Sequence, residues 1–246
     1  CKGGDIMRVY RALRFLDGLT SALAAMLLML LAVYAGYALW DNGQVYAAAE
    51  TVRVSMLELK PEAEEPSFTA LRAVNPDVCA WVTLDGTGVD YPVVQGRDNL
   101  TYVNTDVYGQ FSLAGSIFLD SRCTPDFAGP YSLLYGHHMV GGQMFGDLEK
   151  YQDGAFLREH TAGTLLLPDG ACRLEVFACL LVSASEPHIF SAEQRDTAAL
   201  LAWAEGEALC WQEGAAPERV LAMSTCSSAY TDARTVVLAA IRSEEG

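Results

Sequence analysis

The feature that most constrains this chain is an uninterrupted apolar segment, LTSALAAMLLMLLAVYAGYALW, which fills residues 19–40 and contains no charged side chain. At about 1.5 Å rise per residue, a helix of this length crosses a hydrocarbon core of roughly 30 Å. A cleaved signal peptide is the alternative, but its apolar region usually has only about 7 to 15 residues, and no clear small-residue cleavage site follows Trp40. We therefore expect a retained transmembrane helix over residues 19–40, preceded by an N-terminal segment of residues 1–18.

Basic side chains stand just before this apolar segment. They are Lys2, Arg8, Arg11 and Arg14. Since basic residues that flank a membrane span favour the cytoplasmic side, the N-terminus is expected in the cytoplasm. The sequence thus predicts a single-pass protein of the cell membrane whose main domain is extracellular.

The remainder of the chain is strongly acidic. After residue 40 it carries 12 basic and 29 acidic side chains, a formal charge of −17. Such a surface disfavours nonspecific binding to nucleic acid, so no nucleic-acid partner is expected. Its simplest interpretation is a solvated surface that keeps an extracellular domain soluble. We expect the partners to be peptides or cell-envelope material.

Residues 41–75 predict a helical segment between the membrane and the main domain. Apolar residues recur at three- and four-residue steps until Pro61 ends the first helix. After an acidic hinge, Ser67 is expected to cap a second helix that ends before Pro76. The main domain is accordingly placed at residues 76–246.

In this main domain the pattern changes to short runs rich in Val, Ile, Tyr, Phe and Thr, separated by turns such as LDGTG and LPDGA. The predicted strands are residues 80–84, 91–94, 116–120, 132–135, 164–167, 172–183, 220–225 and 235–242. Several are apolar on both faces, as expected for a sheet that closes on itself and is covered by helices. An apolar stripe predicts one long helix over residues 191–211.

The seven cysteines show no disulfide framework or metal motif. They stand at positions 1, 79, 123, 172, 179, 210 and 226, without a CxxC pair, and an odd number leaves at least one thiol unpaired. The four histidines never stand at metal-ligand spacing with a cysteine pair. We therefore expect no metal ion and no other cofactor.

Cys226 lies between two apolar β-type runs in VLAMSTCSSAYTDARTVVLAAI. Because a free thiol has a pKa of about 8.5, a nucleophilic cysteine needs a neighbouring base or cation. His137 follows a predicted strand and a glycine and enters a polar loop, where catalytic groups tend to lie. By chemistry alone His138 is equally able to act as the base. His160 and His188 have the contexts of surface histidines.

Arg234 follows Cys226 by eight residues and supplies a permanent cation. A guanidinium can bind a carbonyl oxygen, stabilise the oxyanion of a tetrahedral intermediate and favour thiolate over thiol. Taken alone, Cys226 has the context of a buried structural cysteine, and Arg234 that of an ordinary surface residue. Only their combination with a histidine indicates a site for acyl transfer.

Three separated stretches resemble the class B sortases, the membrane-anchored cysteine transpeptidases of Gram-positive bacteria. Residues 75–104 and GSIFLD, residues 115–120, resemble the opening strands of that family. LLYGHHMVGGQMFGDLEKY resembles its histidine segment, including the MFGDL that distinguishes class B, and LAMSTC followed by Arg234 resembles its nucleophile and arginine strands. The resemblance spans about residues 40–242 in consistent order.

This resemblance implies a mostly β fold with accessory helices: a closed, roughly eight-stranded β-barrel, N-terminal helices beside it and one long helix in a crossover. It implies that Cys226 is the nucleophile and that Arg234 binds the oxyanion and the substrate. It also decides between the histidines, because the catalytic one in the family directly follows the glycine, which makes it His137.

Substrate contacts are implied by the same resemblance. Asn99 and Ser224 fall at positions where the family contacts the sorting peptide, and Ile189 is a weaker candidate. One departure is the interval from Cys226 to Arg234, which is shorter than in some class B members and affects how the arginine enters the groove. The additional cysteines are interpreted as small core residues, with a disulfide as the alternative; they are Cys79, Cys123, Cys172, Cys179 and Cys210.

The activity implied is cleavage of a C-terminal sorting motif at a threonine carbonyl through a Cys thioacyl intermediate. The surface protein is then transferred to an amine of a peptidoglycan cross-bridge or of a pilin lysine. A cysteine endopeptidase that uses water as acceptor, and a noncatalytic envelope-binding module, are the alternatives. The sequence fixes neither the sorting motif nor the acceptor.

Overall fold

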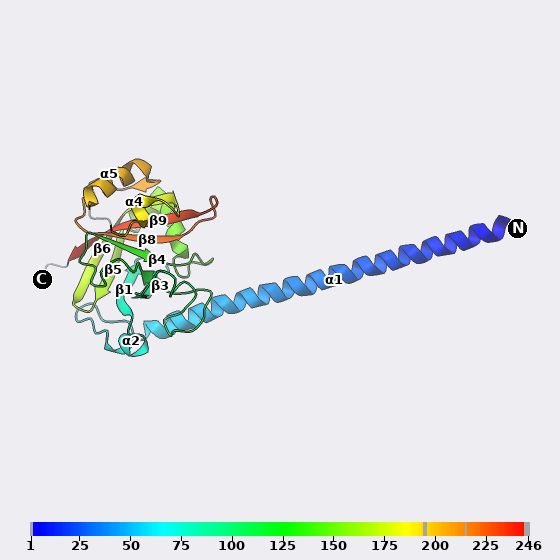
Figure 1. Cartoon of the computed structure of the whole chain (residues 1–246), viewed down its shortest axis with the longest axis horizontal. Helices are drawn as coiled ribbons and strands as arrows, with labels where there is room; N and C mark the ends of the chain where they lie inside the picture. Colours follow the sequence, from blue (N-terminus) through cyan, green and yellow to red (C-terminus); the bar gives the residue numbers. More distant parts are fainter. Residues whose placement is uncertain (1, 194–195, 215, 244–246) are drawn as a thin grey trace. The chain divides into compact units, whose positions relative to one another are not determined.

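The computed structural model describes residues 2–193, 196–214 and 216–243 of the chain (Figure 1). The chain separates into two units, residues 1–47 and residues 48–246.

The first unit is helical in all its described residues, which form the N-terminal part of helix α1 (Lys2–Leu57). Within the described part of the chain, α1 is the one helix long and apolar enough to cross a membrane. It includes the expected span, residues 19–40, whose large apolar side chains are exposed, as Leu28 and Met29 illustrate. The sequence and the structure therefore agree on one candidate membrane span.

The second unit is built around a closed β-barrel. Its described strands are β1 (Val78–Leu84), β2 (Asp90–Val94), β3 (Ile117–Leu119), β4 (Tyr131–Tyr135), β5 (Ala162–Leu167), β6 (Gly170–Ser183), β7 (Cys210–Trp211), β8 (Val220–Cys226) and β9 (Ala233–Ser243). Eight follow one another in the order β5-β1-β2-β3-β4-β8-β9-β6, and β5 also pairs with β6, which closes the ring. The two-residue β7 is added beside β6. This confirms the expected eight-stranded barrel.

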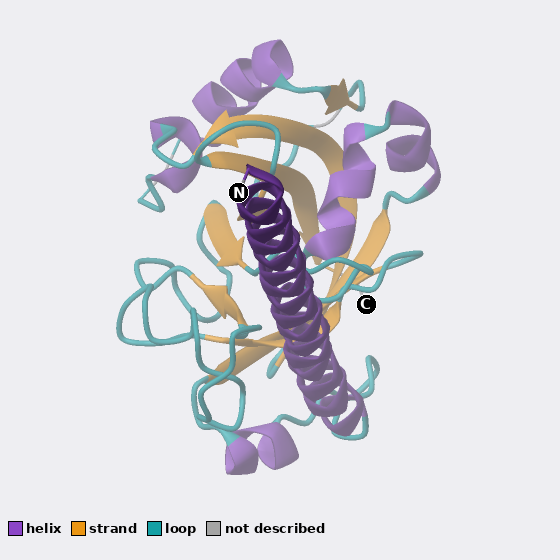
Figure 2. Ribbon diagram, turned by 90° about the vertical axis from the view of Figure 1, so that its right-hand side faces the viewer, coloured by secondary structure: helices purple, strands orange, loops and turns teal. Residues whose placement is uncertain are grey.

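Short helices lie on the outside of the curved sheet (Figure 2). Their bounds are α2 (Thr69–Val74), the 3-10 helix η1 (Gly146–Gln152), α3 (Gly154–Glu159), α4 (Pro187–Phe190) and α5 (Thr197–Glu207). As predicted, α2 ends before Asn75-Pro76. The predicted Ser67 cap is wrong, because Phe68 occupies the N-cap and no side chain caps this helix.

The helix predicted over residues 191–211 is shorter in the structure, and residues 194–195 of the predicted range lie outside the described residues. The structure has the four-residue α4 before this region and α5 within it, and Asp196 caps α5 by accepting a hydrogen bond from the Ala199 amide at 3.0 Å. The helix ends at Glu207 because the next residues enter the sheet: the Leu209 amide donates to the Cys179 carbonyl at 2.9 Å. Pairing of β7 with β6 therefore replaces the last helical turn.

The core explains why several strands are apolar on both faces. One apolar cluster lies between the end of α1, α2 and the first strand, where Met56, Leu71 and Trp81 are fully buried. Strand β8 is buried at six consecutive positions and exposed only at its last residue, Cys226. The barrel thus carries a thiol to its surface at the end of a core strand.

Candidate active site

The β8–β9 hairpin places Cys226 directly opposite Arg234. The two residues are paired in the antiparallel register, and the turn between them is closed by a hydrogen bond from the Ser227 amide to the Ala233 carbonyl at 2.9 Å. Directly opposed residues on antiparallel strands project from the same face, with Cβ atoms about 4.5–5.5 Å apart. The short Cys-to-Arg interval therefore places the two residues side by side in the sheet, and the Arg234 guanidinium donates to the Ala233 carbonyl at 3.1 Å.

The neighbouring strand β4 carries His137 to the same end of the barrel. Strands β4 and β8 are parallel, with Tyr135 paired to Ser224, and the Gly136 amide donates to the Ser224 carbonyl at 3.1 Å. A side chain at Gly136 would collide with Ile117 and with the Phe145 ring at 2.7 Å, so a glycine is needed for this close approach. His137 consequently leaves β4 beside the end of β8.

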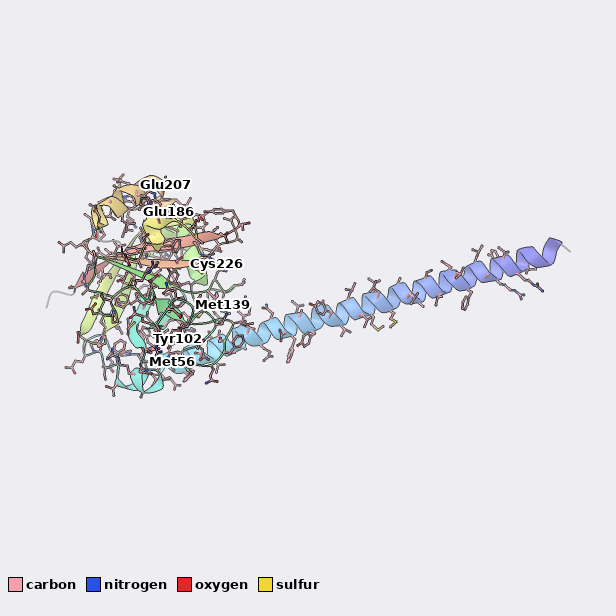
Figure 3. All side chains as sticks on the ribbon, in the orientation of Figure 1. Met56, Tyr102, Met139, Glu186, Glu207 and Cys226 are labelled. Carbon is pink, nitrogen blue, oxygen red and sulfur yellow. The ribbon has the colours of Figure 1, made fainter. Side chains whose placement is uncertain are left out.

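A cavity of about 390 Å³ lies where these strand ends meet. Cys226, which is labelled in Figure 3, is one of its lining residues. Five of the six residues predicted for the site line it: Asn99, His137, Ser224, Cys226 and Arg234. The rest of the wall consists of Val103, Phe118, Arg122, Tyr135, Gly136, Ala184, Phe190 and Thr225. Two segments far apart in the sequence, the end of β4 and the β8–β9 hairpin, thus contribute an imidazole, a thiol and a guanidinium to one cavity.

The two adjacent histidines have different surroundings. His137 is half-buried, and its Nε2–H donates to the Val103 carbonyl at 2.8 Å. Its Nδ1 atom is then the ring nitrogen left for acid–base chemistry. His138 instead lies 3.1 Å from the Glu149 carboxylate and lines a separate surface hollow with residues 139–142. The structure therefore places only His137 in the cavity with Cys226.

Cys226 differs from the other described cysteines in its exposure. Cys79, Cys123, Cys172 and Cys179 are buried and Cys210 is partly buried, whereas Cys226 is exposed. Burial raises the pKa of Cys79 to about 12 and also raises that of Cys179. These inner thiols remain protonated at neutral pH and have the character of core residues. Cys1 lies outside the described residues.

The predicted substrate residues are positioned differently from one another. Asn99 Nδ2 donates to Asp120 at 2.7 Å, and its Oδ1 accepts from the Ser121 amide at 2.8 Å. Ser224 is buried, and its hydroxyl has no hydrogen-bond partner among the described residues. It lies two residues before Cys226 in β8 and so shares a strand face with it.

Ile189, the weaker candidate for a substrate contact, does not line the cavity. Its side chain is completely buried, and its carbonyl accepts a hydrogen bond from the Tyr131 hydroxyl at 2.7 Å. The next residue, Phe190, lines the cavity and stacks on Tyr135 with ring centroids 6.3 Å apart. Helix α4 therefore turns Phe190, not Ile189, towards the site.

Sequence reasoning missed the part of the wall formed by Arg122, Tyr135 and Phe190. The closest sequence indication is the acid-x-base pattern of Asp120 and Arg122, which begins at the last residue of the predicted strand 116–120. In the described residues no group of three or more His, Cys, Asp or Glu side chains is arranged to hold a metal ion.

The arrangement is suited to acyl transfer. An exposed thiol provides a nucleophile, an imidazole can exchange a proton, and a guanidinium can stabilise negative charge that develops on a carbonyl oxygen. The apolar and aromatic side chains beside them offer a surface for an extended peptide. Water and other small nucleophiles have access, because Cys226 is exposed.

Comparison with known proteins gives consistent matches over this unit. A sortase domain family model matches residues 82–242. Sortase B of Staphylococcus aureus (strain NCTC 8325 / PS 47) is 30% identical over 187 residues, which cover 73% of this chain and 76% of that protein.

Solved structures extend the similarity to the fold. A Streptococcus pyogenes class B sortase involved in pilus biogenesis is 34% identical, with a TM-score of 0.66 over 72% of this chain and 98% of its own. The Staphylococcus aureus sortase B–substrate complex is 27% identical, with a TM-score of 0.66 over 83% of this chain and 97% of its own.

Proposed function

This chain belongs to the class B sortases, which are cysteine transpeptidases, and from this we propose that it cleaves the C-terminal sorting motif of a surface protein at a threonine carbonyl and transfers that threonine to an amine. The observation that carries the proposal is the cavity shared by Cys226, His137 and Arg234. No metal or organic cofactor takes part in the proposed reaction.

In the first half-reaction, the Cys226 sulfur attacks the threonine carbonyl carbon as a thiolate. The carbonyl oxygen becomes an oxyanion, which the Arg234 guanidinium stabilises. The C–N bond then breaks, and His137 gives its proton to the departing amine. The products are a thioacyl enzyme and the released C-terminal peptide.

In the second half-reaction, an amine enters the same cavity and attacks the thioester carbonyl. His137 removes a proton from this amine, and the Cys226 thiolate is expelled as the new amide bond forms. Thiolate and imidazolium are thereby restored. The acceptor we propose is the amine of a peptidoglycan cross-bridge or of a pilin lysine, and the pilus role of the Streptococcus pyogenes relative favours including the latter.

We place this reaction at the outer face of the cell membrane. Residues 1–18 are proposed to be cytoplasmic, residues 19–40 to span the membrane, residues 41–75 to form a helical connection and residues 76–246 to form the extracellular catalytic domain. The apolar window of α1 and the basic residues before it support this topology. A surface protein and a lipid-linked acceptor would both reach such an enzyme along the membrane.

The test is a peptide assay with the full chain in detergent micelles. Peptides that contain threonine at the cleavage position and vary at the flanking positions are incubated with and without triglycine, and the products are identified by mass spectrometry. A transpeptidase yields peptide joined to triglycine. Hydrolysed peptide alone, even with abundant triglycine, would instead identify a cysteine endopeptidase. Absence of both products, together with slow alkylation of Cys226, would identify a noncatalytic binding module.

A further inference from the structure

A buried carboxylate lies directly behind the cavity wall. Asp120 follows the last residue of β3, and its side chain has no exposed surface. It does not line the cavity itself, and the proposed reaction does not use it. Since an isolated buried charge is costly, the reason for keeping an ionised side chain here must lie in the groups around it.

Five hydrogen bonds converge on the two carboxylate oxygens of Asp120. Oδ1 accepts from the amide and the Nε of Arg122 at 3.0 and 2.9 Å. Oδ2 accepts from Arg122 Nη2 at 2.9 Å, from the Tyr135 hydroxyl at 3.0 Å and from Asn99 Nδ2 at 2.7 Å. Burial raises the pKa of Asp120, but these hydrogen bonds outweigh it and hold the pKa below its ordinary value.

Each side chain that donates to Asp120 belongs to the cavity wall. Asn99, Arg122 and Tyr135 come from three different segments, and all three line the cavity. Arg122 Nη2 also donates to the Phe190 carbonyl at 2.9 Å, and the Phe190 ring stacks on Tyr135. One carboxylate therefore connects four separate segments of the wall.

The contact with Asn99 fixes the orientation of an amide. The Asn99 oxygen accepts from the Ser121 amide, and its nitrogen donates to Asp120, which as a carboxylate can only accept. A flipped amide would lose both bonds. One N–H and one oxygen lone pair of Asn99 remain, which is the donor and acceptor pattern that matches the backbone of an extended peptide.

We propose that Asp120 is a positioning residue for substrate binding: it sets the orientation of Asn99 and holds the Arg122, Tyr135 and Phe190 wall that receives the sorting peptide. This inference rests on the proposed function of the same cavity. It assigns Asp120 no contact with the reacting atoms, so its removal should weaken peptide binding and leave the chemical step largely intact.

The test compares Asp120→Asn with a matched control, Asp90→Asn. Asp90 also accepts three side-chain hydrogen bonds, from Lys60 at 2.7 Å, Trp81 at 2.6 Å and Thr83 at 2.9 Å, but it does not line the cavity. For a sorting peptide cleaved by the full chain, Asp120→Asn should raise KM about tenfold and change kcat less than about threefold. Asp90→Asn should change neither by more than about twofold.

A double-mutant cycle with Asn99→Ala separates an effect of Asp120 that acts through Asn99 from a general destabilisation of the fold. If Asp120 acts largely through Asn99, Asp120→Asn should raise KM by much less than tenfold in the Asn99→Ala background. Equal factors in both backgrounds would contradict action through Asn99. A lower kcat with unchanged KM would overturn the proposal as a whole.

Two further measurements keep the result interpretable. Tyr135→Phe removes one donor to Asp120 and keeps the ring, so it should raise KM about two- to threefold even if Asp120→Asn folds poorly. The alkylation rate of Cys226 should be the same in all these variants, because the thiol does not touch Asp120.

If the unmodified chain cleaves no sorting peptide, the proposed function fails and this inference with it. If the chain cleaves the peptide and its KM is insensitive to substitution of Asp120, only the inference fails.

Discussion

At the residue scale, the functional difference between His137 and His138 follows from one step along the backbone. Consecutive residues at a strand end project in opposite directions, so His137 enters the cavity while His138 meets Glu149 on the surface. The family resemblance predicts that His137 is the catalytic histidine, because it directly follows the glycine. Side-chain chemistry alone does not distinguish them, because both are imidazoles able to act as the base. Their different surroundings in the folded chain make the distinction.

Replacement of the histidines one at a time tests this difference. His137→Ala should lower kcat/KM for peptide cleavage by about 10²–10⁴-fold, since the leaving amine loses its proton donor. His138→Ala should retain most of the activity and change the free energy of unfolding by about 1 kcal/mol at most, as expected for a surface ion pair. Steady-state kinetics and thermal unfolding measure the two effects. Equal losses of activity would show that the cavity does not distinguish the histidines.

Gly115 affects His137 from a distance, through the backbone. Its φ is +59°, and a Cβ at this position would collide with the Val103 carbonyl oxygen, the group that accepts the hydrogen bond from His137. Gly115→Ala should therefore lower kcat about tenfold, because the imidazole loses its fixed orientation. The matched control is Gly109→Ala, which has a φ of +77° but open space around the Cβ. The control carries the same kind of backbone strain, so equal activity of the two variants would contradict the prediction.

At the element scale, the strands near the site were predictable and the region after β6 was less so. The predicted strands at residues 220–225 and 235–242 appear as β8 and β9, because alternating and β-branched apolar residues specify buried strands locally. Residues 208–211 follow a helical pattern, yet Cys210 and Trp211 pair with β6. That pairing is a long-range contact, which local periodicity does not contain.

The candidate site shows the same division between local and long-range information. Cys226, His137 and Arg234 were predicted from their sequence contexts together with the family resemblance, and the structure places all three in one cavity. Asp120 and Phe190 were missed. The position of Asp120 depends on hydrogen bonds from Asn99 and Tyr135, which lie 21 and 15 residues away in the chain, and that of Phe190 on a bond from Arg122, 68 residues away. A single sequence carries no record of such contacts.

The α5 helix offers a prediction about stability that is independent of activity. Asp196 caps its N-terminus by accepting from the Ala199 amide, and no residue of α5 lines the cavity. Asp196→Ala should therefore lower the free energy of unfolding by about 1 kcal/mol and leave peptide cleavage unchanged. The control is Glu205→Ala, at an exposed position of the same helix, which should be nearly neutral. Denaturant unfolding measures both changes, and a loss of activity in Asp196→Ala would contradict the separation of α5 from the site.

For the molecule as a whole, labelling of the exposed Cys226 thiol can test the proposed membrane topology. Cys226 is exposed, whereas Cys79 and Cys179 are buried with raised pKa values. On intact cells that express the full chain, a membrane-impermeant maleimide should label Cys226 within minutes and label the buried cysteines much more slowly. Mass spectrometry identifies the labelled peptide, and Cys226→Ser cells serve as the control. Labelling that requires cell lysis would place the catalytic unit on the cytoplasmic side.

Closure of the barrel also limits how an extended chain can associate with it. Each of the eight barrel strands pairs with a neighbour on both sides over at least part of its length, whereas the described β7, two residues long, pairs on one side only. An incoming strand can extend a sheet only along a row of free backbone N–H and C=O groups. Among the described strands, closure of the ring leaves short unpaired stretches, which disfavours edge-to-edge association of neighbouring copies into fibrils.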